Sequence, residues 1–420
     1  MDDLYKDSEV ELTDKTKHTL CDLKNALEDE LHRIMDYWVL YAPDDKYGGF
    51  IGHVDQNNIK IQDADKGVVL NSRILWTFSA MFKRTGEKKY LDLARRAYNY
   101  MVEYFVDRTH GGVYSTVNHK GIPVSDKKQI YCQAFAMYSF SEYYLASGDA
   151  SSLKQAENIF HLLEKYSWDN EHKGYVEAFS NDWSPVTDYR LSEKDENYPK
   201  TMNSHLHLLE AYTCFYKASG FATAKKALRE MVTLFVNRII QSNGHLELYF
   251  DMDWTPSGKY VSYGHDIEAA WLINEALGYL DTDLSFNPLQ GRANLLAETF
   301  RKEAIDIDGG VLNELDLRSH GLSAEKHHWP QAEALVGLLD AYEITGREDY
   351  LQLCIGVFQY IQRYIIDPLN GEWFLRVDKQ GSPMGDEKIG YWKCPYHNAR
   401  ACMEVNQRIE RILEKSNAAC

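Results

Sequence analysis

The chain has 420 residues, of which 44% are hydrophobic and 13% are aromatic, including 29 Tyr and 9 Trp. This length allows two or three average domains or one large closed architecture, so composition alone leaves the domain count open. The formal net charge is −17 and no Lys/Arg-rich run occurs, which argues against nucleic acid as a partner.

Cysteine spacing and hydropathy predict a cytoplasmic protein without a membrane span. The seven cysteines are scattered and never form a Cys-x-x-Cys pair, a pattern typical of reduced thiols. The first twenty residues lack the basic start and apolar core of a signal peptide, and no window holds eighteen uninterrupted apolar residues. Residues 1–17 are polar and acidic, so we predict a disordered extension there and a single domain over residues 18–420.

A glycine followed by alternating apolar residues and a polar turn recurs six times. The six copies begin at Gly48, Gly111, Gly174, Gly244, Gly309 and Gly371. Their spacings of 63, 63, 70, 65 and 62 residues are too regular for independent loops. Each copy predicts a short hairpin, and the period predicts a repeat architecture.

Between the hairpins, two amphipathic helical runs are separated by a small break. The breaks contain Gly86, Gly148, Gly220 and Gly346, each of which predicts a helix C-cap. Six hairpin–helix–helix units could form an open solenoid or close into a double ring of inner and outer helices. We favour the closed ring, an all-α fold, because neither end shows a polar capping repeat.

Side chains capable of chemistry follow each hairpin, near the start of the first helix of the unit. They are Arg73, Tyr131, Asn203, His207, His265, Glu268, Trp329, Glu333, Trp392 and His397. Taken singly, each could be a core aromatic, a hydrogen-bonded histidine or an ion-paired charge. In a closed ring, however, their recurrence at one level would bring them to one mouth, which favours a site.

Two histidines on opposite sides of a pocket suit proton abstraction and return on two faces of a carbon. His265 and Glu268 lie one helical turn apart, so we expect the carboxylate to orient this ring. An arginine nearby would stabilise an enediolate oxygen, and aromatic rings would stack on sugars. A metal site is the chemical alternative, with His320, His327 and His328 as further ligands, but no His-Glu-x-x-His motif occurs and we predict no metal.

The sequence Trp-Lys-Cys-Pro-Tyr-His-Asn-Ala-Arg at residues 392–400 resembles the cellobiose 2-epimerases of the N-acylglucosamine 2-epimerase superfamily. The resemblance extends over residues 20–415 and includes the segments 66–76, 200–203, 262–269 and 329–333. It implies an (α/α)6 barrel, which agrees with the closed ring. One departure is His328, because the family commonly has a second tryptophan at this position before Trp329.

The resemblance also implies the reaction and the residue roles. His265 and His397 would be the paired acid/base residues at C2 of the reducing-end sugar of a disaccharide, with Glu268 supporting His265 and His207 assisting. Arg73 and Tyr131 would hold the open-chain sugar, Trp329 and Trp392 would stack on it, and the intermediate would be a cis-enediol(ate). Asn203 and Glu333 complete the predicted substrate contacts. No cofactor is implied, and we expect a monomer.

Other functions stay open on the sequence alone. A monosaccharide 2-epimerase or an aldose–ketose isomerase would use the same barrel. A glycoside hydrolase could use Glu268, Glu333 and Glu314 as its carboxylates. A non-catalytic carbohydrate-binding protein would use the aromatic residues alone, but it would have no need for two imidazoles and an arginine at one level.

Overall fold

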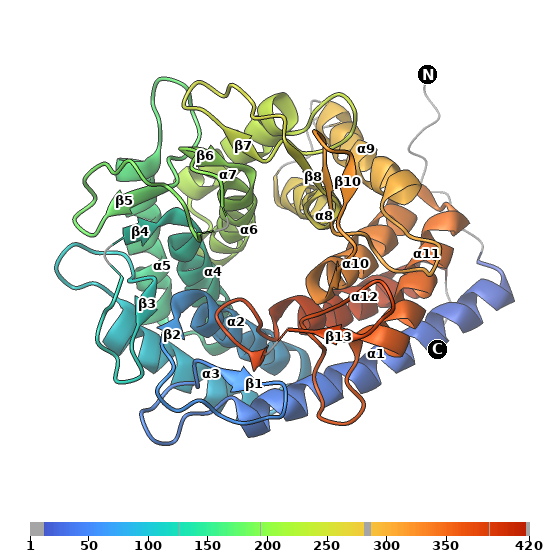
Figure 1. The fold of residues 1–420 in the computed structure, drawn as a ribbon, viewed down its shortest axis with the longest axis horizontal. Coiled ribbons are helices and arrows are strands. Elements are labelled where there is room, and N and C mark those ends of the chain that lie inside the picture. Colours follow the sequence, from blue (N-terminus) through green and yellow to red (C-terminus); the bar gives the residue numbers. More distant parts are fainter. Residues whose placement is uncertain (1–11, 126, 194, 281–286, 386, 417–420) are drawn as a thin grey trace.

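Twelve α-helices form two concentric rings in the computed structural model, which describes residues 12–416 apart from 126, 194, 281–286 and 386 (Figure 1). The inner ring consists of α2 (Val68–Thr85), α4 (Ile130–Ser147), α6 (Met202–Ser219), α8 (Tyr263–Tyr279), α10 (His328–Thr345) and α12 (Tyr396–Lys415). The outer helices are α1 (Asp14–Tyr41), α3 (Lys88–Tyr100), α5 (Ala150–Leu162), α7 (Ala222–Leu234), α9 (Asn287–Glu303) and α11 (Glu348–Tyr360). The predicted (α/α)6 barrel is confirmed.

The distribution of buried residues around each helix differs between the inner and the outer ring. In α4, 14 of 18 residues are buried, because both its faces are covered by other helices. The outer helix α5 buries only one stripe, Ser152, Ala156, Ile159 and Phe160, at the spacing of an amphipathic helix. Helices α3, α5, α7 and α11 each end in a π-helical turn, in the order Met101–Phe105, Leu163–Ser167, Phe235–Ile239 and Ile361–Ile365.

The ring closes through the two ends of the chain. Helix α12 packs against both α10 and α2, and α1 packs along the outside of α12 as the outer member of the sixth pair (Figure 1). Helix α1 begins earlier than predicted, because the Thr13 hydroxyl accepts a hydrogen bond from the Thr16 N–H and caps the helix. Residues 14–17 of the predicted extension therefore belong to α1, and residues 1–11 lie outside the described residues.

The repeat glycines have the backbone conformation that their positions require. All six leading glycines have positive φ angles, from +75° at Gly371 to +87° at Gly309. The predicted C-cap glycines, Gly86, Gly148, Gly220 and Gly346, are left-handed as well. Only glycine adopts this region without strain, so the recurrence of glycine follows from the geometry of the repeat.

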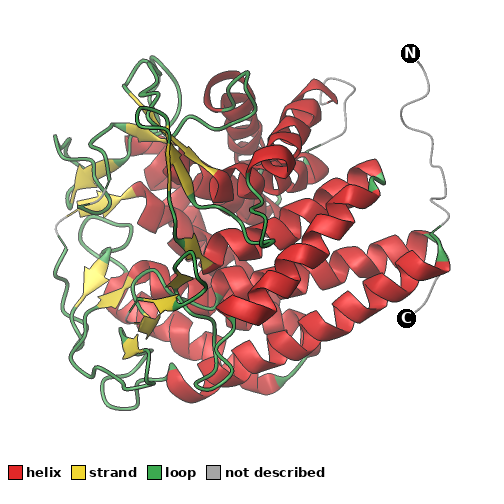
Figure 2. Ribbon diagram, turned by 45° about the vertical axis from the view of Figure 1, so that its right-hand side comes forward, coloured by secondary structure: helices red, strands yellow, loops and turns green. Residues whose placement is uncertain are grey.

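Short antiparallel strands lie together with the long loops at one end of the barrel, and the helices extend away from them (Figure 2). The strands are β1 (Val54–Asp55), β2 (Lys66–Gly67), β3 (Thr116–Val117), β4 (Lys127–Gln129), β5 (Ala178–Ser180), β6 (Lys200–Thr201), β7 (Tyr249–Phe250), β8 (Tyr260–Ser262), β9 (Glu314–Asp316), β10 (Gly321–Leu322), β11 (Lys326–His327), β12 (Arg376–Val377), β13 (Pro383–Met384) and β14 (Glu387–Ile389). The strand before an inner helix pairs with a strand of the next unit, as in β2–β3, β4–β5, β6–β7, β8–β9 and β11–β12. The last such pair, β14 with β1, joins the two ends of the ring.

An ion pair between a buried lysine and an aspartate repeats in five of the six units. The lysine lies in the short strand before an inner helix, and the aspartate lies in the turn that begins the glycine motif. The pairs are Lys66–Asp44, Lys128–Asp107, Lys200–Asp169, Lys326–Asp306 and Lys388–Asp367, with Nζ to carboxylate distances of 2.7 to 2.8 Å. The fourth unit has Val261 and Gln241 at these positions, so both charges are replaced together. A single buried charge would lack its partner.

The Lys128→Met variant should lose about 3–5 kcal/mol of unfolding free energy, because Asp107 would be left buried and unpaired. Both side chains are fully buried in the native protein. The double variant Lys128→Val with Asp107→Gln, which copies the fourth unit, should recover most of this loss. Denaturant unfolding measures both effects, and equal destabilisation by the single and double variants would contradict the explanation.

The fourth residue of several inner helices holds the strand-like segment beside it. Gln133 accepts a hydrogen bond from the Val113 N–H and donates one to its carbonyl, at 2.8 Å each. On α6 the equivalent residue is His205, whose Nε2 accepts from the Tyr175 N–H at 2.9 Å while Nδ1 lies 2.7 Å from the Thr201 carbonyl. This histidine is therefore held in its neutral form.

Because the His205 imidazole is buried, we expect the unfolding free energy to depend on pH. Burial lowers the pKa of its imidazole to about 4, below the ordinary value of about 6.5 in the unfolded chain. The folded state then binds fewer protons, so stability is lost as the pH falls below 6.5, by about 3 kcal/mol once the pH is below 4. The His205→Gln variant should keep its stability at pH 7 and show a shallower loss on acidification. Urea unfolding between pH 7 and pH 4 measures the difference, and parallel profiles would contradict it.

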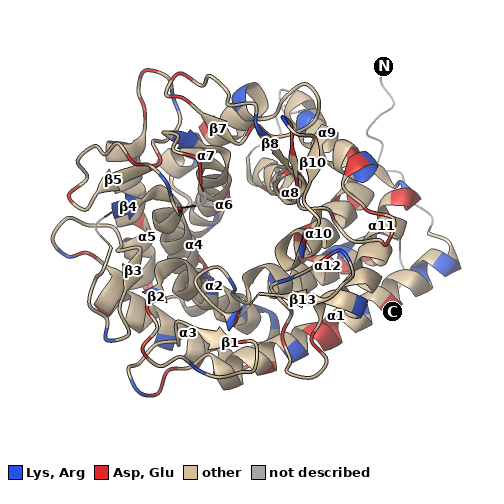
Figure 3. Cartoon of the chain, in the orientation of Figure 1, with Lys and Arg blue, Asp and Glu red and all other residues tan. Residues whose placement is uncertain are grey.

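The surface and the cysteines bear on the remaining sequence predictions. Positions occupied by Lys and Arg are interspersed along the chain with those occupied by Asp and Glu (Figure 3). No helix among the described residues is long and apolar enough to cross a membrane.

Cys132, Cys214, Cys354, Cys394 and Cys402 are buried free thiols. Cys21, however, is disulfide-bonded, so the prediction that every cysteine is reduced is wrong at this position.

Candidate active site

Nine of the ten predicted residues line one pocket of about 240 Å³ at the loop end of the barrel. They are Arg73, Tyr131, Asn203, His207, His265, Glu268, Trp329, Trp392 and His397. All six inner helices or the loops before them contribute, so the prediction of a common mouth is confirmed. The tenth residue, Glu333, is buried behind His397 and does not face the pocket. Four further lining residues are Leu191, Ser192, Asp195 and His328.

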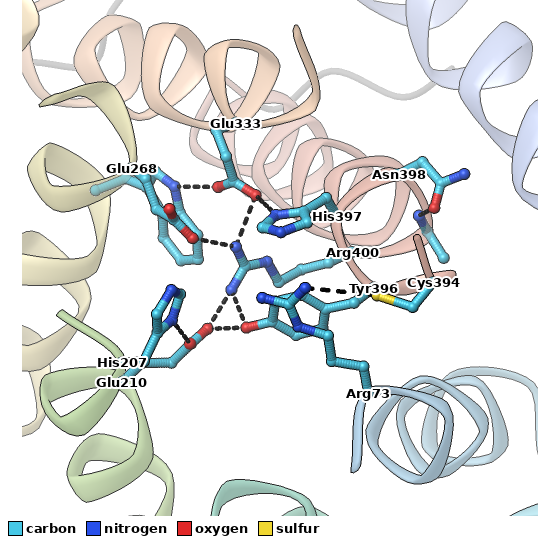
Figure 4. Close-up of polar contacts among 12 residues, drawn as sticks. Arg73, His207, Glu210, Glu268, Glu333, Cys394, Tyr396, His397, Asn398 and Arg400 are labelled. Carbon is cyan, nitrogen blue, oxygen red and sulfur yellow. Dashed lines mark hydrogen bonds and ion pairs between the residues drawn. The ribbon is translucent and has the colours of Figure 1, made fainter. Parts of the chain in front are cut away.

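Three pocket histidines are held through Nδ1, so that Nε2 is the nitrogen available to a ligand. His397 Nδ1 lies 2.6 Å from Glu333 Oε1, and His207 Nδ1 lies 3.0 Å from Glu210 Oε2 (Figure 4). His265 Nδ1 lies 2.7 Å from the Ser262 hydroxyl. A carboxylate partner fixes the tautomer and supports a positive charge on the ring, so His397 and His207 are prepared for proton transfer.

The predicted support of His265 by Glu268 is wrong. Within the described chain, the His265 ring bonds Ser262, while Glu268 Oε1 accepts a hydrogen bond from Arg400 Nη2 at 3.0 Å. The spacing of three residues does place both side chains on one side of α8. Arg400, from a helix distant in sequence, attracts the carboxylate more strongly than a neutral imidazole does.

Arg400 joins three buried carboxylates beneath the pocket, and we call Arg400, Glu210, Glu268 and Glu333 the Arg400 network. Its Nη1 donates to Glu210 and to the Tyr396 hydroxyl, and its Nη2 donates to Glu268 at 3.0 Å and to Glu333 at 2.7 Å (Figure 4). The guanidinium also stacks on the Tyr396 ring at 4.2 Å. One cation therefore positions the carboxylates that hold His207 and His397.

Two carboxyl groups of the Arg400 network have pKa values shifted in opposite directions. Burial opposes the ionisation of Glu210, but Arg400 and His207 outweigh it and lower the pKa of this carboxyl. Burial, together with the neighbouring Glu333, raises the pKa of Glu268 well above its usual value. Sequence reasoning missed Glu210 and Arg400, although Glu210 lies three residues after His207 and Arg400 ends the recognised 392–400 segment.

Glu268, Glu333 and His397 are close enough to hold a metal ion, since one ligand atom from each lies within 4.8 Å of the others. The Arg400 guanidinium already donates hydrogen bonds to both carboxylates. Its positive charge supplies the compensation that a cation would bring. Two of the three side chains are thus already bound to a protein cation.

Arg73 is a buried cation that faces the pocket without an acidic partner. Only 4% of the residue is exposed, and none of the described carboxylates lies within ion-pair distance of it. Its Nη2 donates to the Tyr131 hydroxyl at 3.0 Å and its Nη1 lies 3.6 Å from Cys394 Sγ. The guanidinium stacks on Phe135 at 4.3 Å. An uncompensated buried cation is suited to an anion that forms during a reaction.

Trp329 forms the wall between the two histidines predicted to act as acid and base. Its ring lies 4.7 Å from that of His265 and 5.8 Å from that of His397, measured between centroids. Gly264 permits this approach, because a Cβ there would lie 2.5 Å from the Trp329 ring. Trp392 lies on the loop before α12, 37% exposed, at the pocket entrance.

The pocket histidines are neutral in the folded protein at neutral pH. Burial lowers the pKa of His265 to about 3. Burial also lowers the pKa of His207, and that of His397 falls well below its usual value. Each ring can therefore accept a proton, and in His207 and His397 the carboxylate at Nδ1 leaves Nε2 as the accepting nitrogen. Neutral bases on two sides of one pocket, with a cation for the resulting oxyanion, match proton transfer at a carbon beside a carbonyl.

The chain belongs to the N-acylglucosamine 2-epimerase family, whose model matches residues 49–401. It is 39% identical to the cellobiose 2-epimerase of Bacteroides fragilis, over 91% of this chain and 98% of that protein. The structure of cellobiose 2-epimerase from Spirochaeta thermophila superimposes with a TM-score of 0.89 at 36% identity, covering 96% of this chain and all of that one. A D-mannose isomerase structure, 20% identical with a TM-score of 0.81, shares the fold.

Proposed function

We propose that this protein is a cellobiose 2-epimerase, an isomerase that reversibly inverts C2 of the reducing-end glucose in β-1,4-linked disaccharides. Cellobiose would give glucosyl-mannose, and lactose would give epilactose. The observation that carries the proposal is the pairing of two neutral histidines, His265 and His397, with the uncompensated cation of Arg73 in one pocket. The full-length relatives named as cellobiose 2-epimerases support it.

The reaction begins on the open-chain aldose. Nε2 of one histidine removes the C2 proton, the C2 electron pair forms the C1–C2 double bond, and the carbonyl oxygen becomes an enediolate oxygen. Arg73, with the Tyr131 hydroxyl, stabilises that negative charge. After rotation about C2–C3, the other histidine takes up a proton from solvent and delivers it to the opposite face of C2, so that the enediolate returns to an aldose. The first histidine releases the proton that it removed to solvent, and both rings are neutral again.

The Arg400 network determines which groups move protons. It holds Glu333 against His397 and Glu210 against His207, so each of these rings can carry a positive charge during the reaction. His265 has only the Ser262 hydroxyl. Glu210 and Glu333 are bound to Arg400 outside the pocket lining, and their role is positioning. The predicted assignment of Glu333 as a substrate contact is therefore replaced by a positioning role in this proposal.

The space beside Trp392 favours a disaccharide over a monosaccharide. A second cavity of about 400 Å³ shares Leu191, Ser192 and Trp392 with the histidine pocket. The Trp392 ring, which is partly exposed, lines both cavities and offers an apolar face for a sugar ring. We place the non-reducing sugar there and the reducing-end sugar between His265 and His397.

Proton NMR in D₂O tests this function. Purified protein is incubated with cellobiose or lactose in the presence of a chelator and without nucleotide. A mannose-type reducing end carrying deuterium at C2 is the expected product. Turnover of free monosaccharides alone would replace the proposal with a monosaccharide epimerase, and shorter sugars would indicate a hydrolase.

Two predictions about the state of the protein accompany this function. A monomer and a cytoplasmic location are inferred from the sequence. Sedimentation velocity tests the first. Fractionation of the source cells tests the second, which the disulfide at Cys21 makes worth measuring directly.

A further inference from the structure

His328 is a fourth histidine in the pocket, and its role is not explained by the reaction above. It is the first residue of α10 and is 2% exposed. Its Nδ1 lies 2.9 Å from the Leu375 carbonyl oxygen. A carbonyl oxygen can only accept, so Nδ1 carries the proton and Nε2 presents a lone pair.

The Nε2 atom of His328 is buried and has no hydrogen-bond partner among the described residues. Burying such an acceptor without a donor is costly, and folded proteins rarely leave one unpaired. Because His328 lines the pocket, a ligand in the pocket can supply the donor. The pocket thus contains an acceptor that the protein alone does not satisfy.

The surroundings of His328 suit binding and not proton transfer. His207 and His397 are paired with carboxylates, whereas His328 is paired with a neutral carbonyl. Burial and the nearby Lys393 ammonium, itself buried and bonded to Glu372 at 2.6 Å, lower the pKa of His328 well below its usual value. The ring therefore stays neutral, and Nε2 keeps the lone pair that accepts a hydrogen bond.

The distance between His328 and His397 limits which part of a ligand His328 can contact. Its ring centroid lies 6.5 Å from that of His397, at an interplanar angle of 81°. A sugar whose C2 faces His397 would therefore bring one of its own hydroxyl groups near His328. A tryptophan at position 328 would offer only a donor and would make a different contact.

We propose that His328 is a specificity-determining residue whose Nε2 accepts a hydrogen bond from one hydroxyl group of the reducing-end sugar. The identity of this sugar rests on the proposed function. The hydrogen bond makes the enzyme sensitive to the presence of that single hydroxyl, because a ligand without it would leave a buried acceptor unpaired.

Calorimetry with cellobiitol, the reduced form of cellobiose, tests the contact without turnover. This compound carries the open-chain hydroxyls but no carbonyl, so it cannot be epimerised. His328→Phe, which keeps a planar ring and removes the acceptor, should weaken binding about tenfold to a hundredfold. His328→Gln, which can present an acceptor oxygen, should recover part of the loss. His161→Phe, on the exposed face of α5, is the matched control and should bind as the wild type does.

Monodeoxy derivatives of cellobiitol, altered at the reducing-end residue, identify the hydroxyl. In the wild type, one derivative should bind more weakly by a factor close to that of His328→Phe, and in His328→Phe the same derivative should bind as well as cellobiitol. Equal binding of cellobiitol by the wild type and by His328→Phe would overturn the proposal. That result is expected if Nε2 accepts a hydrogen bond only from water. Equal losses for every derivative in both proteins would overturn it as well.

This result is separable from the proposed function. If the wild type binds cellobiitol through His328 but leaves cellobiose unchanged in D₂O, the epimerase proposal fails and the contact stands. If the wild type epimerises cellobiose and the His328 variants have unchanged KM and kcat, the contact fails and the function stands. Absence of both turnover and binding would overturn both.

Discussion

Replacing either His265 or His397 by asparagine is expected to stop epimerisation while leaving hydrogen exchange at C2 of one epimer. Removing a general base costs about 10²–10⁴ in rate, and inversion needs both histidines. The remaining histidine can still remove and return the proton on its own face. His397→Asn should therefore exchange one of cellobiose and glucosyl-mannose with D₂O, and His265→Asn should exchange the other.

Proton NMR of each variant with each epimer separately gives the result and also assigns a face of C2 to each histidine. His161→Asn, at the exposed site on α5, is the control and should epimerise normally. Exchange of the same epimer by both variants would show that the two histidines do not act on opposite faces. Full epimerisation by either variant would remove that residue from the mechanism.

Replacing Arg400 by methionine is expected to reduce stability by about 3–5 kcal/mol, because charged groups would be left buried without a partner. Arg400 is fully enclosed and contacts Glu210, Glu268 and Glu333. The carboxylates would take up protons and release His207 and His397. We therefore expect kcat to fall even where the variant is fully folded, with less effect on cellobiitol binding.

Denaturant unfolding and kcat measured on the folded fraction separate the two consequences. Arg411→Met is the matched control on the same helix, because Arg411 is 43% exposed and pairs with Glu343 at the surface. Its loss should stay within about 1 kcal/mol. Arg400→Lys keeps the charge but cannot donate through two separated nitrogens, so intermediate stability and low kcat are expected. Wild-type kcat in Arg400→Lys would contradict a positioning role.

The barrel could be predicted from the sequence because its repeat is imposed by local geometry. A leading glycine at each of six positions adopts a positive φ, and a C-cap glycine ends four inner helices. These requirements depend only on residues close in the sequence, so glycine recurs there at regular intervals. The start of α1 was missed because Thr13 and Asp14, which begin it, lie within an acidic segment that resembles a disordered tail.

The pocket residues could be predicted for a related reason. Each lies close to the start of an inner helix, and closure of six similar units brings equivalent positions together. Tyr131, His265 and His397, which the repeat predicts at one level, all line the pocket. The prediction that Glu268 pairs with His265, three residues before it on α8, is wrong, because the partner of Glu268 is Arg400 on α12.

The sequence by itself thus determined the six-fold repeat, favoured the double ring over an open solenoid, and identified nine of the side chains that line the pocket. Only the tertiary structure decided how those side chains are paired: Glu333 with His397, Glu210 with His207, and Arg400 with all three carboxylates. The physical reason is that a turn or a cap depends on neighbouring residues. A buried charge instead takes the strongest partner that packing brings within reach, and the carboxylate partners of Arg400 are between 67 and 190 residues away.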